Sequence, residues 1–197
     1  MKKNLLISIL MTIVTTILLG IIYPLVVTGL SQLFFKDKAN GQLIVQNGQL
    51  IGSRIIGQAF TGPGYFHSRP SAAGNGYDAA NSNGSQLGPT NHQLIDRVKA
   101  SVTDAGVDNP GQLVPIDLVT TSASGLDPDI TPAAAEFQLQ RVTKERGATV
   151  EQLQQLIAKH TEGRQFGFLG EPRVNVLELN LDLDQQFPLK KQAVLRP

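Results

Sequence analysis

Residues 5–35 form a run of 31 positions without a charged side chain, and this run limits the folds open to the chain more than any other feature. A helix needs about 20 apolar residues to cross a hydrocarbon core of roughly 30 Å. Residues 5–30 alone would extend about 39 Å at roughly 1.5 Å per residue. Because backbone polar groups in lipid must be satisfied within the segment, the run predicts a transmembrane anchor helix over residues 1–35.

A cleaved signal peptide is the main alternative for this segment. The apolar part of a signal peptide normally spans about 7–15 residues and ends in small residues before the cleavage point. The observed run is about twice as long, and residues 31–35, Ser-Gln-Leu-Phe-Phe, make a poor cleavage site. These features favour a retained anchor.

The charges at the two ends of the run are nearly balanced. Lys2 and Lys3 flank one end, while Lys36 and Lys38 flank the other end with Asp37 between them. Since positive residues concentrate on the cytoplasmic side of a membrane, this pattern leans only slightly towards a cytoplasmic N-terminus.

Three residues inside the run bear on its shape and contacts. Pro24 is expected to kink the helix or to end its regular part, and Gly20 loosens the same region. Small residues let transmembrane helices approach closely. Gly20 and Gly29 are therefore candidate contacts with a partner helix, with membrane lipid as the other partner of the segment.

The composition of the remaining chain excludes several functions. All 16 acidic residues lie beyond residue 35, together with all but two of the 17 basic ones, so this part is close to neutral. A near-neutral domain is a poor candidate for binding nucleic acid, and no nucleic-acid partner is expected. The absence of Cys excludes a disulfide framework, a thiolate nucleophile and Cys-ligated zinc.

Residues 36–197 are expected to form a single α+β domain of mixed helices and strands. An Asn-Gly pair between short apolar runs predicts a β-hairpin over residues 43–51. Residues 55–56 and 114–119 resemble further strands. Apolar residues at alternating positions predict a long strand over residues 174–183, with a bulge at residues 177–178.

Three helices are expected between these strands. Residues 91–105 carry apolar side chains on one helical face and are followed by a glycine. A Thr-Pro pair predicts the start of a second helix at residues 131–146. Thr149 and Gln152 have the spacing of a capping box for a third helix.

Residues 61–91 are rich in Gly, Asn and Ser and are expected to form a long loop. Long loops in compact domains are either functional or disordered. Tyr65, Phe66 and Tyr77 indicate partial order, because aromatic side chains gain much from burial.

Residues 60–71 combine aromatic side chains with a histidine and an arginine. Tyr65, Phe66, His67 and Arg69 are candidate partner contacts, since aromatic and Arg side chains are typical of interfaces. The alternative is structural: Tyr65 and Phe66 would hold the loop in place, and Arg69 would bind backbone carbonyls.

Ser82, Asn83, Gly84, Ser85 and Gln86 form a candidate nucleotide contact. Backbone N–H groups in such a stretch could surround phosphate oxygens. The stretch lacks a cation that would pair with the phosphate charge.

Common catalytic motifs are absent from the sequence. It has no Walker-type phosphate loop and no Gly-x-Ser-x-Gly elbow, and His67, His92 and His160 lack the spacing of a metal site. His160 is expected to be a partly buried or capping residue. Asp127 and Asp129 are expected to form an Asx-turn rather than to bind a hard cation. No catalytic residue and no metal site are therefore expected.

Eight short motifs follow one another along nearly the whole chain. They are Tyr23-Pro24-Leu25, Gly57-Gln58, residues 60–71, Ser122-Ala123-Ser124-Gly125-Leu126-Asp127, Ile130-Thr131-Pro132, Val150-Glu151-Gln152-Leu153, Val174-Asn175-Val176 and Leu179-Asn180-Leu181. In this order and at these separations, they resemble the C subunit of the Kdp-type potassium-transporting ATPase of bacteria. The basic stretch after residue 185 departs from the short tails of that family.

The resemblance implies a noncatalytic accessory subunit of a high-affinity, ATP-driven potassium import complex. It implies three partners: a potassium-channel-like subunit, a P-type ATPase subunit that hydrolyses ATP, and a small membrane subunit. It also implies a single-pass protein of the cytoplasmic (inner) membrane, with the N-terminus inside and the C-terminal domain outside.

The resemblance further implies that the chain stabilises assembly and acts as a chaperone that promotes ATP binding by the ATPase subunit. A domain outside the membrane cannot touch cytoplasmic ATP, so such an effect would require coupling through the complex. The chain is expected to have no cofactor of its own, with ATP acting through the complex. If the domain bound ATP itself, the Gly/Ser-rich stretch of the family would map onto residues 82–86.

Two other functions stay open from the residues. One is a membrane-anchored extracytoplasmic hydrolase or binding module that uses His67 or His92, although the sequence displays no matching nucleophile or orienting acid. The other is a nucleotide-binding regulator with a cytoplasmic domain.

Lys190 and Lys191 are expected to lie in a solvated tail.

Overall fold

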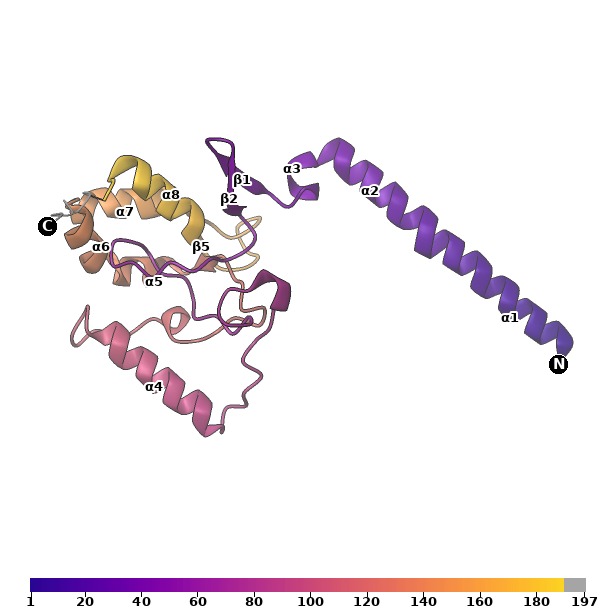
Figure 1. Ribbon diagram of the computed structural model, residues 1–197, viewed down its shortest axis with the longest axis horizontal. Helices are drawn as coiled ribbons and strands as arrows, with labels where there is room; N and C mark the ends of the chain where they lie inside the picture. Colours follow the sequence, from indigo (N-terminus) through magenta and orange to yellow (C-terminus); the bar gives the residue numbers. More distant parts are fainter. Residues whose placement is uncertain (190–197) are drawn as a thin grey trace, which may run out of the picture. The chain divides into compact units, whose positions relative to one another are not determined.

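The computed structural model describes residues 1–189, and its contacts divide the chain into two units, Met1–Ser53 and Arg54–Pro197. Figure 1 shows a long helical rod in the first unit, and several shorter helices around a small sheet in the second. The combination of helices with short antiparallel strands confirms the predicted α+β class. Lys190 and Lys191 lie outside the described residues.

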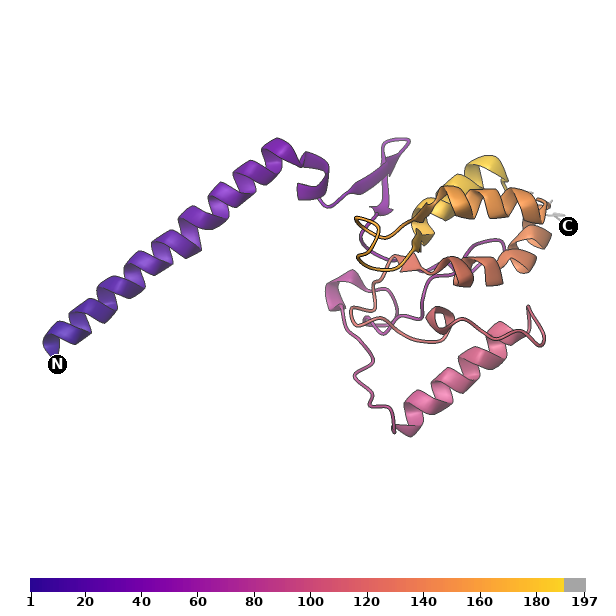
Figure 2. The ribbon, with the colours of Figure 1, turned by 180° about the vertical axis from the view of Figure 1, so that it is seen from behind.

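The first unit begins with the helical residues Lys2–Phe34. In this segment α1 (Lys2–Thr15) and α2 (Tyr23–Phe34) are joined by a π-helical stretch, Thr16–Ile22, and Figure 2 shows one continuous rod. Pro24 lies in the first turn of α2 and has no N–H to donate back along the helix. The wider π-helical spacing accommodates this missing bond. The regular α-helical pattern is interrupted just before Pro24, but the helix continues through α2 and does not end there.

No side chain of this helix is buried within the described part of the chain. Its most apolar window has a mean hydropathy of 2.7, and the helix has 33 residues, which extend about 50 Å. It is the one helix among residues 1–189 that is long and apolar enough to cross a membrane. A core helix of a soluble domain would instead be covered by its own fold.

The predicted hairpin over residues 43–51 is confirmed. After the short helix α3 (Lys36–Ala39), strands β1 (Leu43–Gln46) and β2 (Gln49–Ser53) pair antiparallel. Asn47 and Gly48 have φ angles of 52° and 78°, the positive values that a tight two-residue turn requires.

The predicted strand over residues 55–56 is wrong, because residues 54–56 form a turn at the start of the second unit. Asn175 Nδ2 donates a hydrogen bond to the Arg54 carbonyl at 2.8 Å. The Gly57 N–H donates to the Leu126 carbonyl at 2.8 Å. These two bonds direct the backbone into the loop that follows.

The second unit contains a three-stranded antiparallel sheet in the order β3-β5-β4. Its strands are β3 (Asp129–Ile130), β4 (Thr161–Glu162) and β5 (Arg173–Asn175). Its helices are α4 (His92–Gly106), α5 (Pro132–Phe137), α6 (Leu139–Arg146), α7 (Val150–Lys159) and α8 (Val176–Gln186), with 3-10 turns at Ala79–Asn81 and Ile116–Leu118.

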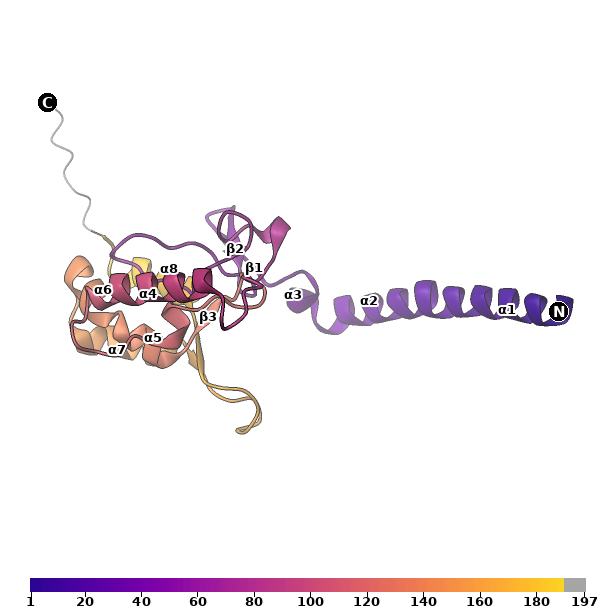
Figure 3. The ribbon, with the colours of Figure 1, turned by 90° about the horizontal axis from the view of Figure 1, so that it is seen from below.

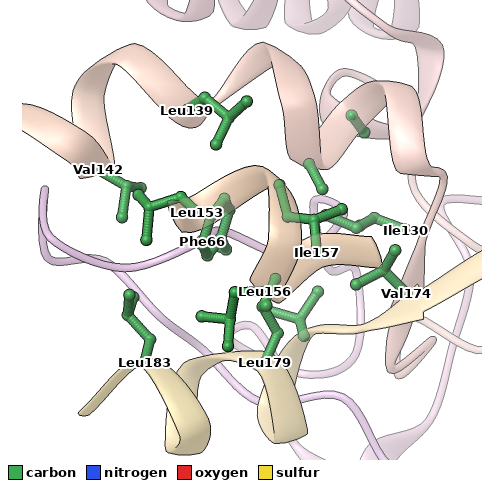
Figure 4. Close-up of a cluster of buried hydrophobic side chains, with 13 residues drawn as sticks. Phe66, Ile130, Leu139, Val142, Leu153, Leu156, Ile157, Val174, Leu179 and Leu183 are labelled. Atoms are coloured by element: carbon green, nitrogen blue, oxygen red, sulfur yellow. The ribbon is translucent and has the colours of Figure 1, made fainter. Parts of the chain in front are cut away.

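The hydrophobic core of the second unit lies between α5, α6, α7, α8 and the small sheet (Figure 4). Its buried members are Phe66, Ile130, Ala134, Ala135, Leu139, Val142, Leu153, Leu156, Ile157, Val174, Val176, Leu179 and Leu183. Phe66 reaches this core from the 61–91 loop, so the predicted partial order of that loop has a physical basis.

The predicted long strand over residues 174–183 is wrong, because β5 ends at Asn175 and α8 begins directly after it. Asn175 Oδ1 accepts a hydrogen bond from the Glu178 N–H at 3.1 Å and thereby caps the helix. The buried positions 176, 179 and 183 follow a helical period. Leucines at 179, 181 and 183 also fit a strand period, and the Asn cap is the local feature that favours the helix.

The structure differs from two further predictions. The predicted strand over residues 114–119 is wrong: Asp117 sits in a 3-10 turn, and its Oδ2 accepts a hydrogen bond from the Thr131 N–H at 2.7 Å. The predicted helix 131–146 is divided into α5 and α6 at Gln138. The predicted helix 91–105 and the capping box at the start of α7 are confirmed.

Candidate functional site

The loop of residues 60–71 is fixed to the second unit through its backbone. The Phe66 N–H donates to Asn180 Oδ1 at 2.9 Å, and Asn180 Nδ2 donates to the Phe66 carbonyl at 2.9 Å. Asn180, on α8, is 1 % exposed, and Phe66 is 0 % exposed. The prediction that Phe66 contacts a partner is wrong, because its ring is packed in the core.

His67 is held in the same way by the side-chain amide of Gln138. The His67 N–H donates to Gln138 Oε1 at 2.7 Å, and Gln138 Nε2 donates to the His67 carbonyl at 3.1 Å. The imidazole Nε2 lies 3.0 Å from the Gly62 carbonyl, to which the Nε2–H tautomer of the ring donates. Burial, together with the nearby charge of Arg141, lowers the pKa of His67. The ring is therefore neutral at neutral pH and is directed at its own loop.

Arg69 connects this loop to residues 120–127. Its Nη1 pairs with Asp127 Oδ2 at 2.9 Å, and its Nε and Nη2 donate to the carbonyls of Thr120 and Thr121 at 3.4 Å each. The Tyr77 hydroxyl donates to the Arg69 carbonyl. These contacts match the structural alternative, in which Arg69 binds backbone carbonyls.

Tyr65 packs against the buried guanidinium of Arg146, whose central carbon lies 4.5 Å from the ring centroid. The Arg146 side chain is 0 % exposed and pairs with Asp184 at 2.7 Å. It also donates to the carbonyls of Gly64 and Phe187, at 2.7 and 3.0 Å. Tyr65, His67 and Arg69 thus all bind groups within the second unit, and their contact with a partner stays a prediction.

A cavity of about 600 Å³ lies between this loop and α4. Its wall combines apolar side chains, such as Phe60 and Phe137, with His67 and Arg141. Arg141 forms an ion pair with Asp108 at 3.1 Å. The cavity has the size of a small-ligand pocket, but its His and Arg side chains are already engaged by the protein itself.

Residues 83–86 of the candidate nucleotide contact line a second depression of about 360 Å³ with residues 121–123. Ser82 Oγ and the Asn83 N–H both donate to the Ser124 carbonyl, at 3.0 and 2.9 Å. A Cβ atom at Gly84 would lie 2.9 Å from the Ala123 carbonyl oxygen, so this close approach requires glycine. None of the described residues that line the depression is cationic. The nucleotide contact at residues 82–86 stays a prediction.

Gly20 lies in the π-helical stretch and Gly29 lies in α2. Within the described chain, a Cβ atom at Gly29 would meet nothing within 4 Å, and one at Gly20 would lie 3.8 Å from the Thr16 methyl group. Both glycines therefore leave the helix surface open to close approach, and their contact with a partner helix stays a prediction.

The ionisable residues singled out from the sequence have structural roles. His160 follows the last turn of α7 and pairs with Asp182 at 2.8 Å, which confirms the predicted capping role. The Asp129 N–H donates to Asp127 Oδ1 at 3.1 Å, which is the predicted Asx-turn. His92 is exposed in the first turn of α4. Within residues 1–189, no group of three or more His, Asp or Glu side chains is arranged to hold a metal ion.

Comparisons with known proteins identify the family. Residues 5–185 match the family KdpC, described as the K+-transporting ATPase, c chain. The potassium-transporting ATPase KdpC subunit of Koribacter versatilis is 68% identical over 189 residues, which cover 96% of this chain and 98% of that protein. The chain belongs to the KdpC family.

Other KdpC subunits are also similar to this chain over nearly its whole length. The subunit of Acidobacterium capsulatum is 58% identical over 180 residues, covering 90% of this chain and 96% of that protein. The subunit of Mycobacterium tuberculosis is 52% identical over 188 residues, covering 94% and 100%. The likeness therefore includes both the apolar helix and the second unit.

Membership of the KdpC family makes the chain an accessory subunit of a potassium-importing ATPase complex, and not the subunit that catalyses hydrolysis. The alternative of a membrane-anchored hydrolase or binding module is not supported. The predicted resemblance to the Kdp-type C subunit is confirmed.

Sequence reasoning missed three residues that organise this KdpC-family domain: Gln138, Arg146 and Asn180. The sequence pattern marks Asn180, because it is a polar residue between the apolar Leu179 and Leu181. No local pattern marks Gln138 or Arg146, and the backbone groups that they bind lie about 70 and 80 residues away in the sequence.

Proposed function

We propose that this KdpC-family chain is a single-pass subunit of the cytoplasmic (inner) membrane that stabilises the assembly of the potassium-importing ATPase. The observation that carries the proposal is the helix Lys2–Phe34, which buries no side chain within the described chain. An apolar helix about 50 Å long, uncovered by its own fold, needs lipid or other helices around it. The side chains of Tyr65, His67 and Arg69 bind groups of the second unit itself, which suits a structural subunit.

The N-terminus is inside and the second unit lies outside the membrane in this proposal. The support is the resemblance to Kdp-type C subunits, with a slight contribution from Lys2 and Lys3. Protease added to intact spheroplasts should remove an epitope placed after Pro197 and spare one placed before Met1. The reverse pattern would place the second unit in the cytoplasm and overturn this orientation.

The proposed partners are the potassium-channel-like subunit, the P-type ATPase subunit and the small membrane subunit, with lipid around the rest of the helix. Gly20 and Gly29 are the proposed points of close helix contact. Changing both to Leu should reduce co-purification of the complex in mild detergent. Changing the neighbouring Ile21 and Val27 to Leu is the matched control, and equal yields of both double variants would contradict the contact.

The proposed effect on ATP is indirect: the chain raises the affinity of the ATPase subunit for ATP by coupling through the assembly. The depression lined by residues 83–86 supports an indirect effect rather than direct ATP binding, because its described lining offers no cation to a phosphate. The complex should show a lower KM for ATP with the chain than without it, while the chain alone should not bind ATP in calorimetry. ATP binding by the chain alone, abolished by Asn83→Ala and Gln86→Ala, would instead establish a nucleotide site at residues 82–86.

A further inference from the structure

A hairpin-like projection connects β4 to β5 in the second unit. We call residues 163–171 the Phe hairpin, after Phe166 and Phe168 at its tip. Figure 3 shows it, in orange to yellow, extending away from the body of the second unit. It belongs to none of the sites predicted from the sequence.

The tip of the Phe hairpin is apolar and uncovered. Phe166 is 80 % exposed and Phe168 is 71 % exposed, and Leu169 beside them is also exposed. Phe66 of the same unit is fully buried, as expected for a side chain that gains much free energy on leaving water. Adjacent apolar side chains left in solvent are typical of a surface that another molecule covers.

The Phe hairpin is held in one conformation by its own hydrogen bonds. The N–H groups of Gln165 and Leu169 each donate to the carbonyl of the other residue at 2.9 Å, and the Gly167 N–H donates to the Arg164 carbonyl at 3.1 Å. Phe166 has a φ angle of 54°, which is unusual for a residue with a side chain. A tip fixed in advance loses little conformational entropy when a partner covers it.

The charges around the Phe hairpin cancel one another. Arg164 pairs with Glu171 at 2.7 Å, and Arg173 pairs with Glu162 at 2.5 Å. Binding to an anionic lipid surface normally needs an excess of Lys and Arg beside the apolar residues. The balanced charges and the uncharged aromatic tip instead match the apolar centre and polar rim of a protein interface.

We propose that the Phe hairpin docks this chain onto another subunit of the K+-transporting ATPase, with Phe166 and Phe168 inserted into an apolar pocket of that subunit. The proposal rests on the membership of the chain in an ATPase complex and does not depend on the orientation of the helix. It also moves the expected contact of the second unit from residues 60–71, where Tyr65, His67 and Arg69 bind groups of the same unit, to residues 163–171.

The first test is co-purification of the complex from membranes that contain all the subunits. The double variant Phe166→Ser, Phe168→Ser should reduce recovery of the other subunits with the tagged chain about tenfold or more. Leu113→Ser is the matched control, because Leu113 is 96 % exposed in the same unit, and it should leave recovery unchanged. Recovery equal to that of the control would overturn the proposal.

The second test identifies what covers the tip. The chain has no Cys, so Phe166→Cys provides a single thiol for a photo-crosslinker in the assembled complex, with Leu113→Cys as the control. A Phe166-specific crosslink to another ATPase subunit supports the proposal. A crosslink only to lipid or to a second copy of this chain would overturn it. If the wild-type chain recovered no other subunit in the co-purification, the result would instead overturn the proposed role of the chain in assembly.

Discussion

At the scale of single residues, the backbone N–H and carbonyl groups of residues 66 and 67 bind side-chain amides. These amides take the place of the neighbouring strand that would bind the same groups in a sheet. Asn180 binds both the N–H and the carbonyl of the buried Phe66. Asn180→Leu should lower the free energy of unfolding by about 2–4 kcal/mol, because two buried backbone groups lose their partner. Urea unfolding of the purified chain measures this change. Gln154→Leu, at an exposed position of α7, should change it by less than about 0.5 kcal/mol.

His67 should make the stability of the second unit depend on pH. Burial lowers its pKa from the ordinary value of 6.5, so the unfolded state takes up a proton first as the pH falls. The contribution of neutral His67 is complete above about pH 6.5 and is lost as the pH falls from there towards the folded-state pKa. Urea midpoints at about pH 8 and pH 5.5 should therefore differ less in His67→Gln than in the wild type, and equal differences would contradict this role.

At the scale of elements, Asn175 determines where β5 ends and α8 begins. Its Oδ1 caps the helix, while its Nδ2 donates to the Arg54 carbonyl. Asn175→Ala should lower the free energy of unfolding by about 1–2 kcal/mol. Asn175→Ser keeps a capping oxygen and should recover about half of that loss in the same urea experiment. Equal losses in the two variants would show that capping contributes little.

The elements also show which parts of the fold the sequence could predict. The hairpin β1–β2, the helix α4 and the capping box of α7 depend on neighbouring residues, and their patterns were sufficient. The break at Gln138 depends on His67, which is distant in sequence. For the candidate site, aromatic and Arg content indicated a binding surface at residues 60–71. The sequence could go no further there, because composition alone does not distinguish a side chain bound inside the fold from one that faces a partner.

At the scale of the whole molecule, the length of the apolar helix should make membrane insertion tolerant of a single charge. An Arg at a helix centre costs about 2.5–3.5 kcal/mol, while each Leu or Ile near the centre contributes about −0.3 to −0.6 kcal/mol. Leu18→Arg alone should therefore stay in the carbonate-resistant membrane fraction. A triple variant with Val14→Arg, Leu18→Arg and Ile22→Arg should be released. Release of the single variant would show that the helix is only marginally inserted.

The uncovered helix also has a consequence for how the chain is made. Residues 1–35 leave the ribosome before any of the core residues, which all lie beyond Phe60. At that moment no folded partner from the same chain exists that could shield the apolar side chains. We therefore expect delivery to the insertion machinery during translation, because a copy released into the cytosol would leave these apolar side chains in water.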